Sequence, residues 1–136
     1  MNHYILDASF LVVALLKNNP KVIEKWNIVS NEVKNEKAIL HSVSFFLSET
    51  ANALRYTLEK EKAIVYLSLI TNLPINYYNL QPEDWTVILD WSYTHNTTVY
   101  DTSYHYIASL LKGTFLTCDS KYYQKAQKEG FIELIK

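Results

Sequence analysis

Residues 3–16 read HYILDASFLVVALL, an apolar run with one carboxylate, Asp7, near its middle. Such a run near a chain start is typical of a signal peptide or of a buried strand, and neither alone explains an aspartate. A signal peptide also requires a basic segment before its apolar stretch, and residues 1–4 contain no Lys or Arg. We therefore interpret residues 4–6 as a short buried strand that ends at Asp7, followed by a helix over residues 10–16.

The whole chain has 136 residues, a length that predicts one domain over residues 1–136 with a single core. Its 49% hydrophobic and 20% charged residues indicate a globular rather than a disordered chain. The formal net charge of -1 gives no overall attraction to nucleic acid or to anionic membranes. One cysteine, Cys118, excludes an internal disulfide and a cysteine-based zinc site. Because no run reaches the roughly 18 apolar residues of a membrane span, we expect a cytoplasmic protein without a membrane partner.

Strand-like and helix-like segments alternate along the rest of the chain. Helical spacing of apolar residues, interrupted at prolines and glycines, separates short runs that favour strands. This alternation predicts an α/β fold of three layers, α/β/α, with a mainly parallel central sheet covered on both faces. We expect strands at 4–6, 38–43, 75–78, 114–118 and 131–135, and helices at 10–16, from 20, 44–58, 61–73, from 82, after 101, and 120–129.

Carboxylates fall where these strands end. Asp7 ends the first strand, Asp119 ends the fourth, and Asp101 follows an expected extended run over residues 98–100. Each aspartate also suits the N-cap of the next helix, and this structural role is favoured for Asp101 and Asp119 taken singly. Glu49 lies about one and a half turns into a helix, where the helical wheel supports a solvated and a buried position equally.

The case for a functional site rests on these four carboxylates together. Carboxylates gathered at one sheet edge raise each other's pKa unless a cation is present. Hard divalent cations take oxygen ligands, and Mg²⁺ typically binds one or two carboxylates together with water and substrate phosphates. Such a site can position a phosphodiester and activate water for in-line attack. Because parallel sheets bind ligands at the carboxyl ends of their strands, this edge is the expected active crevice.

Four blocks carry a family resemblance: ILDASFLVVALL (5–16), SETANALRY (48–56), VYDTSYHYIASL (99–110) and FLTCDSKYYQKA (115–126). With these blocks in this order, the chain resembles the PIN-domain nucleases, and specifically the small VapC-type toxins of toxin–antitoxin pairs. The resemblance covers essentially the whole chain. Any single block is a weak signal, whereas all four in order, on a strand and helix alternation that agrees, are specific.

The resemblance implies a catalytic site that binds Mg²⁺ or Mn²⁺. It further implies endonucleolytic cleavage of RNA, a homodimer, and a cognate antitoxin whose tail occupies the active groove. The implied metal ligands and catalytic residues are Asp7, Glu49, Asp101 and Asp119. The polar residues that match supporting or substrate-binding positions of the family are Ser9, Asn52, Arg55 and Thr117.

These supporting residues have individual roles in the resemblance. Ser9 is placed to hydrogen-bond water at the metal, and Thr117 matches a hydroxyl position two residues before the last aspartate. Asn52 could orient a ligand or a bound phosphate. Arg55, the only arginine of the chain, is a candidate for contact with phosphate or with the antitoxin.

Two residues depart from the simplest pattern. His105 stands where the family usually has an apolar or small residue, and its spacing from Asp101 would let both face one ligand. We interpret it instead as a partly exposed helical histidine, because one such pair is a weak signal. Cys118 continues an apolar run, and we interpret it as strand filler rather than a reactive thiol.

Other functions compete with a toxin. A housekeeping RNA-processing nuclease would use the same four carboxylates, so the sequence does not separate the two. A non-catalytic binding module of the same fold is disfavoured because all four acids are present. A receiver-type phosphoacceptor domain needs paired acids after the first strand and a lysine after the last, and Asp7 stands alone. Aspartate-based phosphatases require a second aspartate two residues after the first, where this chain has Ser9.

Overall fold

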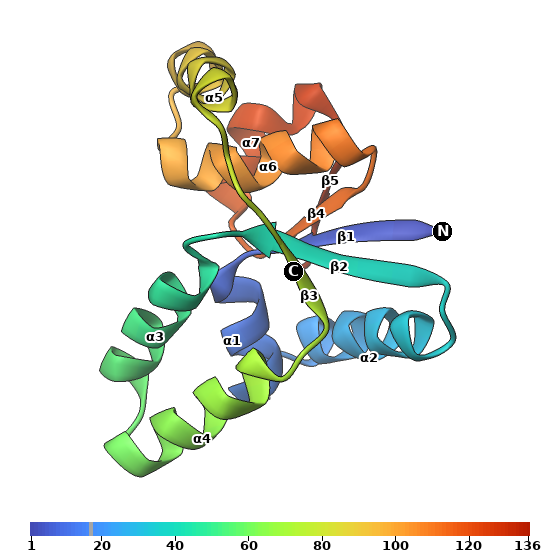
Figure 1. Cartoon of the computed structure of the whole chain (residues 1–136), viewed down its shortest axis with the longest axis vertical. Helices are drawn as coiled ribbons and strands as arrows, with labels where there is room; N and C mark the ends of the chain where they lie inside the picture. Colours follow the sequence, from blue (N-terminus) through green and yellow to red (C-terminus); the bar gives the residue numbers. More distant parts are fainter. Residues whose placement is uncertain (17) are drawn as a thin grey trace.

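The sheet has five strands, all parallel, in the order β3-β2-β1-β4-β5 (Figure 1). The structure is a computed structural model that describes residues 1–16 and 18–136. The expected parallel α/β arrangement is confirmed. The strands are β1 (Asn2–Leu6), β2 (Ala38–Val43), β3 (Ile75–Tyr78), β4 (Thr114–Thr117) and β5 (Ile132–Leu134).

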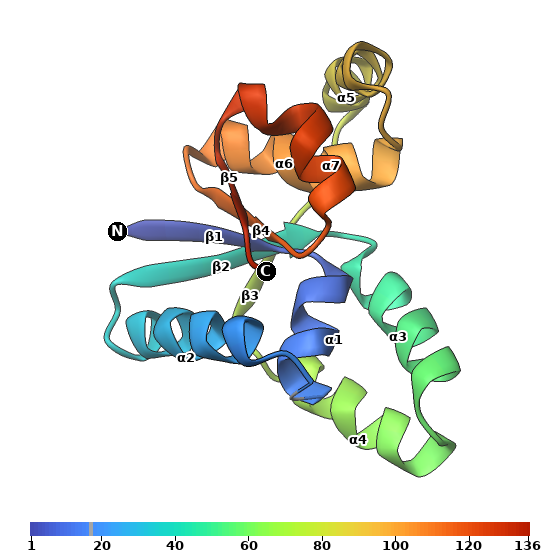
Figure 2. The same ribbon diagram turned by 180° about the vertical axis from the view of Figure 1, so that it is seen from behind.

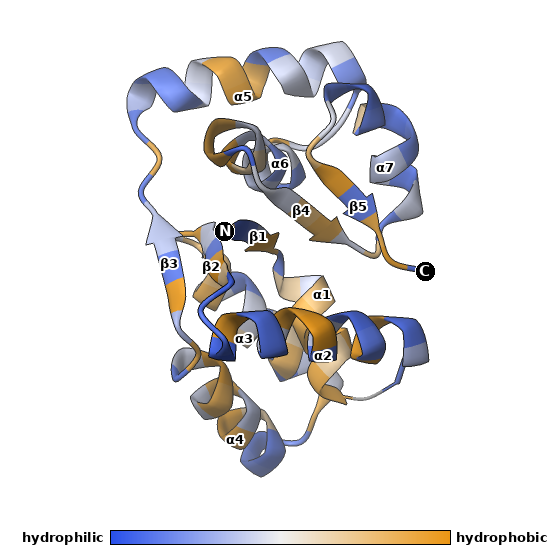
Figure 3. Ribbon diagram, turned by 90° about the vertical axis from the view of Figure 1, so that its right-hand side faces the viewer, coloured by the Kyte–Doolittle hydropathy of each residue, from blue (hydrophilic) through white to orange (hydrophobic). Residues whose placement is uncertain are grey.

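Helices cover both faces of this sheet and complete the three expected layers (Figures 1, 2 and 3). One layer holds α1 (Ala8–Leu16), α2 (Pro20–Lys34), α3 (Phe46–Thr57) and α4 (Lys60–Thr71). The other holds α5 (Pro82–His95), α6 (Val99–Leu111) and α7 (Ser120–Ala126), with the short 3-10 helix η1 (Gln127–Glu129) after α7. None of the helices within these described residues is long and apolar enough to cross a membrane.

The strand order decides where a ligand can bind. The chain leaves β1 toward β2 and β3 on one side, and it later returns to the other side of β1 as β4 and β5. In sheets of this kind the crevice opens at the carboxyl ends of the strands, where the order reverses. Leu6, the last residue of β1, pairs with Leu116 near the end of β4. The strands β1 and β4 therefore end side by side at the switch point, with Asp7 one residue after Leu6 and Asp119 three residues after Leu116.

The apolar residues around Asp7 form the centre of the core. Ile5 and Leu6 of β1 are fully buried, as are Phe10 and Leu11 of α1. Each side chain of this kind contributes about 1.5–3 kcal/mol on burial. Helix α1 packs against both α2 and α3, so its apolar sequence contacts protein on several sides. The segment that carries Asp7 is therefore held rigidly from the strand before it and from the helix after it.

Both ends of α6 have features that the sequence pattern did not predict. Residues 98–100 do not form an extended run, because only Thr98 is extended and Val99 already opens α6. Thr98 is the N-cap of this helix and accepts a hydrogen bond from the amide of Asp101 at 3.1 Å. The N-cap role expected for Asp101 is therefore wrong. The C-cap of α6 is Lys112, with a positive φ of 52°, whereas Gly113 lies against β1. A Cβ at Gly113 would stand 2.4 Å from the carbonyl oxygen of His3, so this close approach requires glycine.

Candidate active site

Asp7 is held by hydrogen bonds from the helix that it precedes. One of its carboxylate oxygens, Oδ1, accepts the Phe10 amide at 2.7 Å and the Ser9 hydroxyl at 3.0 Å. This geometry makes Asp7 the N-terminal cap of α1, and its side chain is only 8% exposed. The capping role and a ligand role are compatible, because the second carboxylate oxygen has no partner among these bonds.

Burial raises the pKa of Asp7 to about 7. Desolvation is the largest cause, and the negative charges of Asp101 and Glu49 raise the pKa further, against the lowering effect of the Phe10 and Ser9 hydrogen bonds. Without a bound cation, the site therefore disfavours the ionised form of Asp7. A bound cation would reverse this preference, because it stabilises the charged form.

Glu49 lies in the first turn of α3 and is half-buried. The hydroxyl of Tyr104, on α6, donates a hydrogen bond to its Oε1 across the crevice. Tyr104 is 2% exposed, and burial together with the Glu49 carboxylate raises its pKa far above the ordinary value. Its hydroxyl consequently remains a donor, and it directs Glu49 toward the sheet edge rather than into solvent.

Asp101 and Asp119 approach from the helices on the other face. Burial raises the pKa of Asp101, and the charges of Asp119 and Glu49 add to this effect, while the Thr98 hydrogen bond lowers it. Asp119 is the N-cap of α7, as expected, because its Oδ1 accepts the Tyr122 amide at 3.0 Å.

The four predicted carboxylates are therefore brought together at one edge. The charges of Asp101 and Glu49 raise the pKa of Asp7, and the charges of Asp119 and Glu49 raise the pKa of Asp101. Over residues 1–16 and 18–136, no group of three or more His, Cys, Asp or Glu side chains stands close enough to form a ready metal cluster. Mg²⁺ does not require such a cluster, since one or two carboxylates, water and substrate phosphate suffice. An all-oxygen donor set of this kind fits Mg²⁺ or Mn²⁺.

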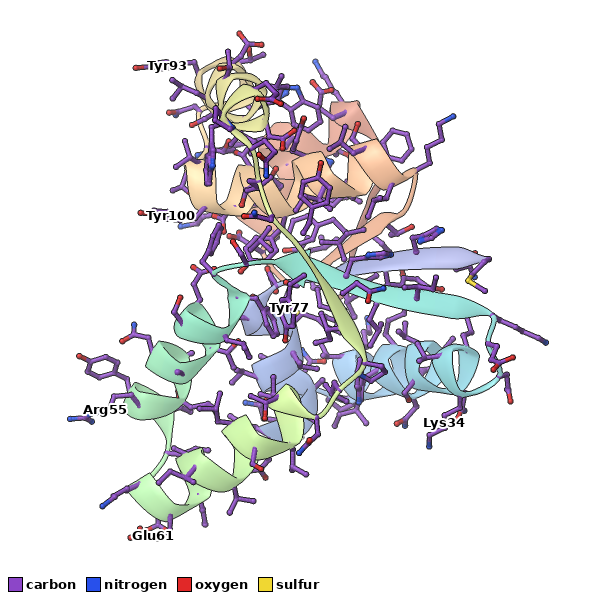
Figure 4. The ribbon with its side chains drawn as sticks, viewed as in Figure 1. Lys34, Arg55, Glu61, Tyr77, Tyr93 and Tyr100 are labelled. Carbon is purple, nitrogen blue, oxygen red and sulfur yellow. The ribbon has the colours of Figure 1, made fainter. Side chains whose placement is uncertain are left out.

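Of the four supporting residues, two contact the carboxylate residues and two do not. Ser9 donates to Asp7, and the buried Thr117 hydroxyl accepts the backbone amide of Asp119 at 3.0 Å. Asn52 is exposed one turn after Glu49. Arg55 lies in the last turn of α3 and points away from the body of the molecule, with its guanidinium 5.4 Å from the ring of Tyr56 (Figure 4).

Sequence reasoning missed a polar pocket beside two of the carboxylates. Asp101 and Asp119 line it together with Lys121 and Lys125 of α7, and its volume is about 290 Å³. The ammonium of Lys125 donates to the backbone carbonyl of Asn96 at 3.0 Å, which orients this side chain. The four-residue spacing of the two lysines on one helix face was the available signal, but it does not say what that face contacts.

The expectation that the side chain of His105 is partly exposed is wrong. It is fully buried, and its Nε2–H donates to the carbonyl of Gly130 at 2.6 Å. Nδ1 then accepts the hydroxyl of Tyr122 at 2.8 Å. Burial lowers the pKa of the ring, which is therefore neutral and does not face a ligand with Asp101. The rings of Trp91 and Phe115 pack around it, and these contacts are distant in sequence.

Cys118 follows β4 and is half-buried beside Asp119. Burial, followed by the charge of Asp7, raises the pKa of its thiol to about 11. Because the thiolate is the nucleophilic form, this environment supports the inert role over a reactive one.

Comparison with solved structures identifies the fold. VapBC2 from Rickettsia felis, solved bound to a DNA fragment from its promoter, is similar with a TM-score of 0.71 and 14% identity, covering 98% of this chain and 99% of that chain. VapC20 from Mycobacterium tuberculosis, described as a sarcin-ricin loop cleaving toxin, is similar with a TM-score of 0.66 and 12% identity, covering 98% and 99%. FitAcB from Neisseria gonorrhoeae is similar with a TM-score of 0.64 and 15% identity, covering 98% and 96%.

Comparison of the sequence alone gives no match. No family model matches it, and no curated protein matches it either. Identities this low establish the fold, which agrees over nearly the whole chain with the fold that the resemblance implied. The activity has to be argued from the residues of this chain.

The raised pKa of Asp7 predicts a stability that depends on pH. In the unfolded chain Asp7 ionises near its ordinary value of 3.8, whereas in the folded metal-free chain it ionises near 7. Stability is therefore lost as pH rises from about 4 to about 7 and stays reduced above that, by about 4 kcal/mol at most. We expect Asp7→Asn, which keeps the capping oxygen, to unfold at a higher urea concentration than wild type at pH 8 in EDTA.

At pH 3.5 the two proteins should unfold at similar urea concentrations, since Asp7 is then mostly protonated in both states of the wild type. The matched control is Asp90→Asn, at an exposed position of α5, which should behave as wild type at both pH values. A variant Asp7→Asn that is less stable than wild type at pH 8 would show that the ionised carboxylate stabilises the fold.

Proposed function

We propose that the chain is a metal-dependent endoribonuclease and the toxin of a toxin–antitoxin pair. The observation that carries the proposal is the set of four carboxylates at the switch point of the sheet, where Asp7 is buried with a pKa of about 7. The fold shared with VapC20, described as a sarcin-ricin loop cleaving toxin, supports RNA as the substrate.

The cofactor that we propose is Mg²⁺ or Mn²⁺, held by Asp7, Glu49, Asp101 and Asp119. When bound, the ion supplies positive charge at the scissile phosphate and acidifies water for attack. The chemistry of the donors supports this assignment, because all four are carboxylates and their mutual repulsion is relieved by a cation.

Other residues of the chain hold these carboxylates in position. Ser9 and the Phe10 amide fix one oxygen of Asp7, and Tyr104 fixes one oxygen of Glu49. Partners of this kind set the orientation of ligands, and their loss commonly reduces metal affinity or activity about 10- to 100-fold. Tyr104 is therefore proposed as a positioning residue.

The polar pocket that Lys121 and Lys125 line, called the lysine pocket below, offers a binding place for the RNA backbone. A strand that reaches the carboxylates must bring its phosphates close to four acidic groups on a chain with a net charge of -1. Lys121 and Lys125 are the cationic side chains that line the pocket of Asp101 and Asp119. We propose that they bind a phosphate adjacent to the one that is cut.

An aromatic patch that includes Tyr100, the residue before Asp101, offers a place where bases can bind. Tyr100 is 59% exposed and points away from the first turn of α6 (Figure 4). Phe45 packs against the edge of Tyr100 at 5.8 Å and stacks with Trp85 at 6.5 Å between centroids. Exposed rings of this kind bind unpaired bases by stacking, which favours single-stranded or loop RNA over a duplex.

The proposed protein partners are a cognate antitoxin and a second copy of the chain. Between α3 and α4 lies a largely apolar groove of about 540 Å³ whose lining includes the two basic residues Arg55 and Lys60. We assign it to an apolar segment of the antitoxin, in keeping with the VapBC2 pair among the similar structures. A short neighbouring reading frame for a DNA-binding protein would distinguish a toxin from a housekeeping nuclease.

The first test is RNA cleavage by Asp7→Asn. We expect cleavage of a mixed-sequence RNA pool in Mg²⁺ or Mn²⁺ to fall about a hundredfold or more, because Asp7 serves the metal rather than the packing. Sequencing of 5′ ends in the products measures the loss and reads the cleavage sequence. Asp90→Asn is the control, and EDTA should abolish cleavage by the wild type. Cleavage by Asp7→Asn at the wild-type rate would overturn the assignment.

The second test concerns the lysine pocket. In Lys121→Gln and Lys125→Gln we expect a higher KM for RNA with kcat nearly retained, since the lysines contact phosphate and not the reacting atoms. Binding of RNA to the Asp7→Asn protein should lose about one unit of salt slope for each lysine removed.

Lys60→Gln, in the groove between α3 and α4, is the matched control for lost charge. An unchanged KM in both pocket variants would place the RNA backbone elsewhere while leaving the carboxylate site intact. Loss of kcat alone would instead assign the lysines to the chemical step.

A further inference from the structure

Two histidines face each other on the central strands, away from the carboxylates. His3 lies on β1 and His41 on the neighbouring β2, with Nδ1 of the first 2.9 Å from Nε2 of the second. Their ring centroids are 5.1 Å apart, and both side chains are half-buried. In the metal-free protein one ring donates a hydrogen bond to the other, so one lone pair already points at the opposite nitrogen.

The pair is separate from the proposed active site. His3 precedes Asp7 by four residues on one strand, which places their backbones about 13 Å apart. Figures 1 and 2 show β1 running from its amino end, on the side away from α3, toward the carboxylate edge. The adjacent Tyr4 points toward α2, where it donates to Glu32, so His3 stands on the opposite face of the sheet.

The spacing of the two nitrogens matches that of two ligands on one ion. Imidazole nitrogens bind at about 2.0–2.1 Å, so a separation of 2.9 Å corresponds to a ligand–metal–ligand angle of about 90°. A tetrahedral ion would need the pair to open by about 0.4 Å. On β3, Asn76 is in register with His41 and shares its face, so an amide oxygen is available beside the pair.

The chemistry of this pair differs from that of the carboxylate edge. Imidazole is a ligand for zinc, copper and nickel, whereas Mg²⁺ selects oxygen. Burial, and then the proximity of His3, lowers the pKa of His41, so this ring is neutral at neutral pH and carries a lone pair that an ion can use. Gly113 packs its backbone on His3 and limits the movement of β1 there.

We propose that His3 and His41 chelate one late first-row divalent ion of the zinc, nickel and copper class, with Asn76 and water completing its coordination. The ion links β1 to β2, the two strands from which Asp7 and the crevice are positioned. Binding to the folded state alone raises stability, so the same ion raises the unfolding temperature of the chain. The proposal does not depend on the nuclease activity.

The test is titration of the tag-free full chain with Ni²⁺ and Zn²⁺ by calorimetry, with excess Mg²⁺ present to compete at the carboxylate edge. We expect one ion to bind per chain, with at least tenfold weaker binding in His3→Gln and in His41→Gln. His95→Gln is the matched control, because His95 pairs with Glu129 at 2.8 Å elsewhere in the molecule. Its affinity should equal that of wild type.

Nuclear magnetic resonance of the wild type gives a second measurement that needs no variant to fold. The chain has four histidines, and we expect added Zn²⁺ to shift the imidazole signals of His3 and His41 together, leaving His95 and His105 unchanged. Binding that survives either substitution at wild-type affinity would overturn the proposal. So would a titration without saturation below about 1 mM metal, or unchanged signals of the pair.

Discussion

The central constraint in the structure is the burial of one ionisable carboxylate, Asp7, at the edge of an apolar sheet. Asp7 leaves β1 between the buried Leu6 and the buried α1, where its charge is poorly solvated and its pKa rises to about 7. Apolar packing sets this position, since the same residues that fill the core also hold the carboxylate. The unfavourable charge of the metal-free edge is the physical reason to expect a cation there.

The topology explains why residues far apart in sequence meet at that edge. The strand order reverses at β1, so Asp7 and Asp119 follow two neighbouring strands, while α3 and α6 bring Glu49 and Asp101 from opposite layers. Tyr104 spans the two layers by donating to Glu49. The helices on both faces are therefore parts of one site rather than a covering of the sheet.

Much of this arrangement could be predicted from the sequence. The strands 38–43 and 75–78 have the expected bounds, because short apolar or β-prone runs between helix signals are local features. The place of Asp7 followed from its interruption of an apolar run. The resemblance supplied the grouping of the four acids, which no local pattern contains.

What could not be predicted depends on contacts between distant segments. The burial of His105 depends on Trp91, Phe115 and the carbonyl of Gly130, which come from three different elements. Asp101 does not have its expected capping role because α6 begins two residues before it, with Thr98 as the N-cap that accepts the Asp101 amide, and a sequence offers both candidates. The pocket of Lys121 exists only because α7 lies beside the loop before α6.

The most direct measurement of the central claim is a calorimetric titration of the protein with Mn²⁺ at about pH 6.5. We expect saturable binding at millimolar concentration or tighter, with protons released as Asp7 ionises. Asp101→Asn should weaken this binding, and His3→Gln should leave it unchanged. A wild-type protein that binds no Mn²⁺ at about 10 mM, or binds it without releasing protons, would contradict the assignment of this edge as the metal site.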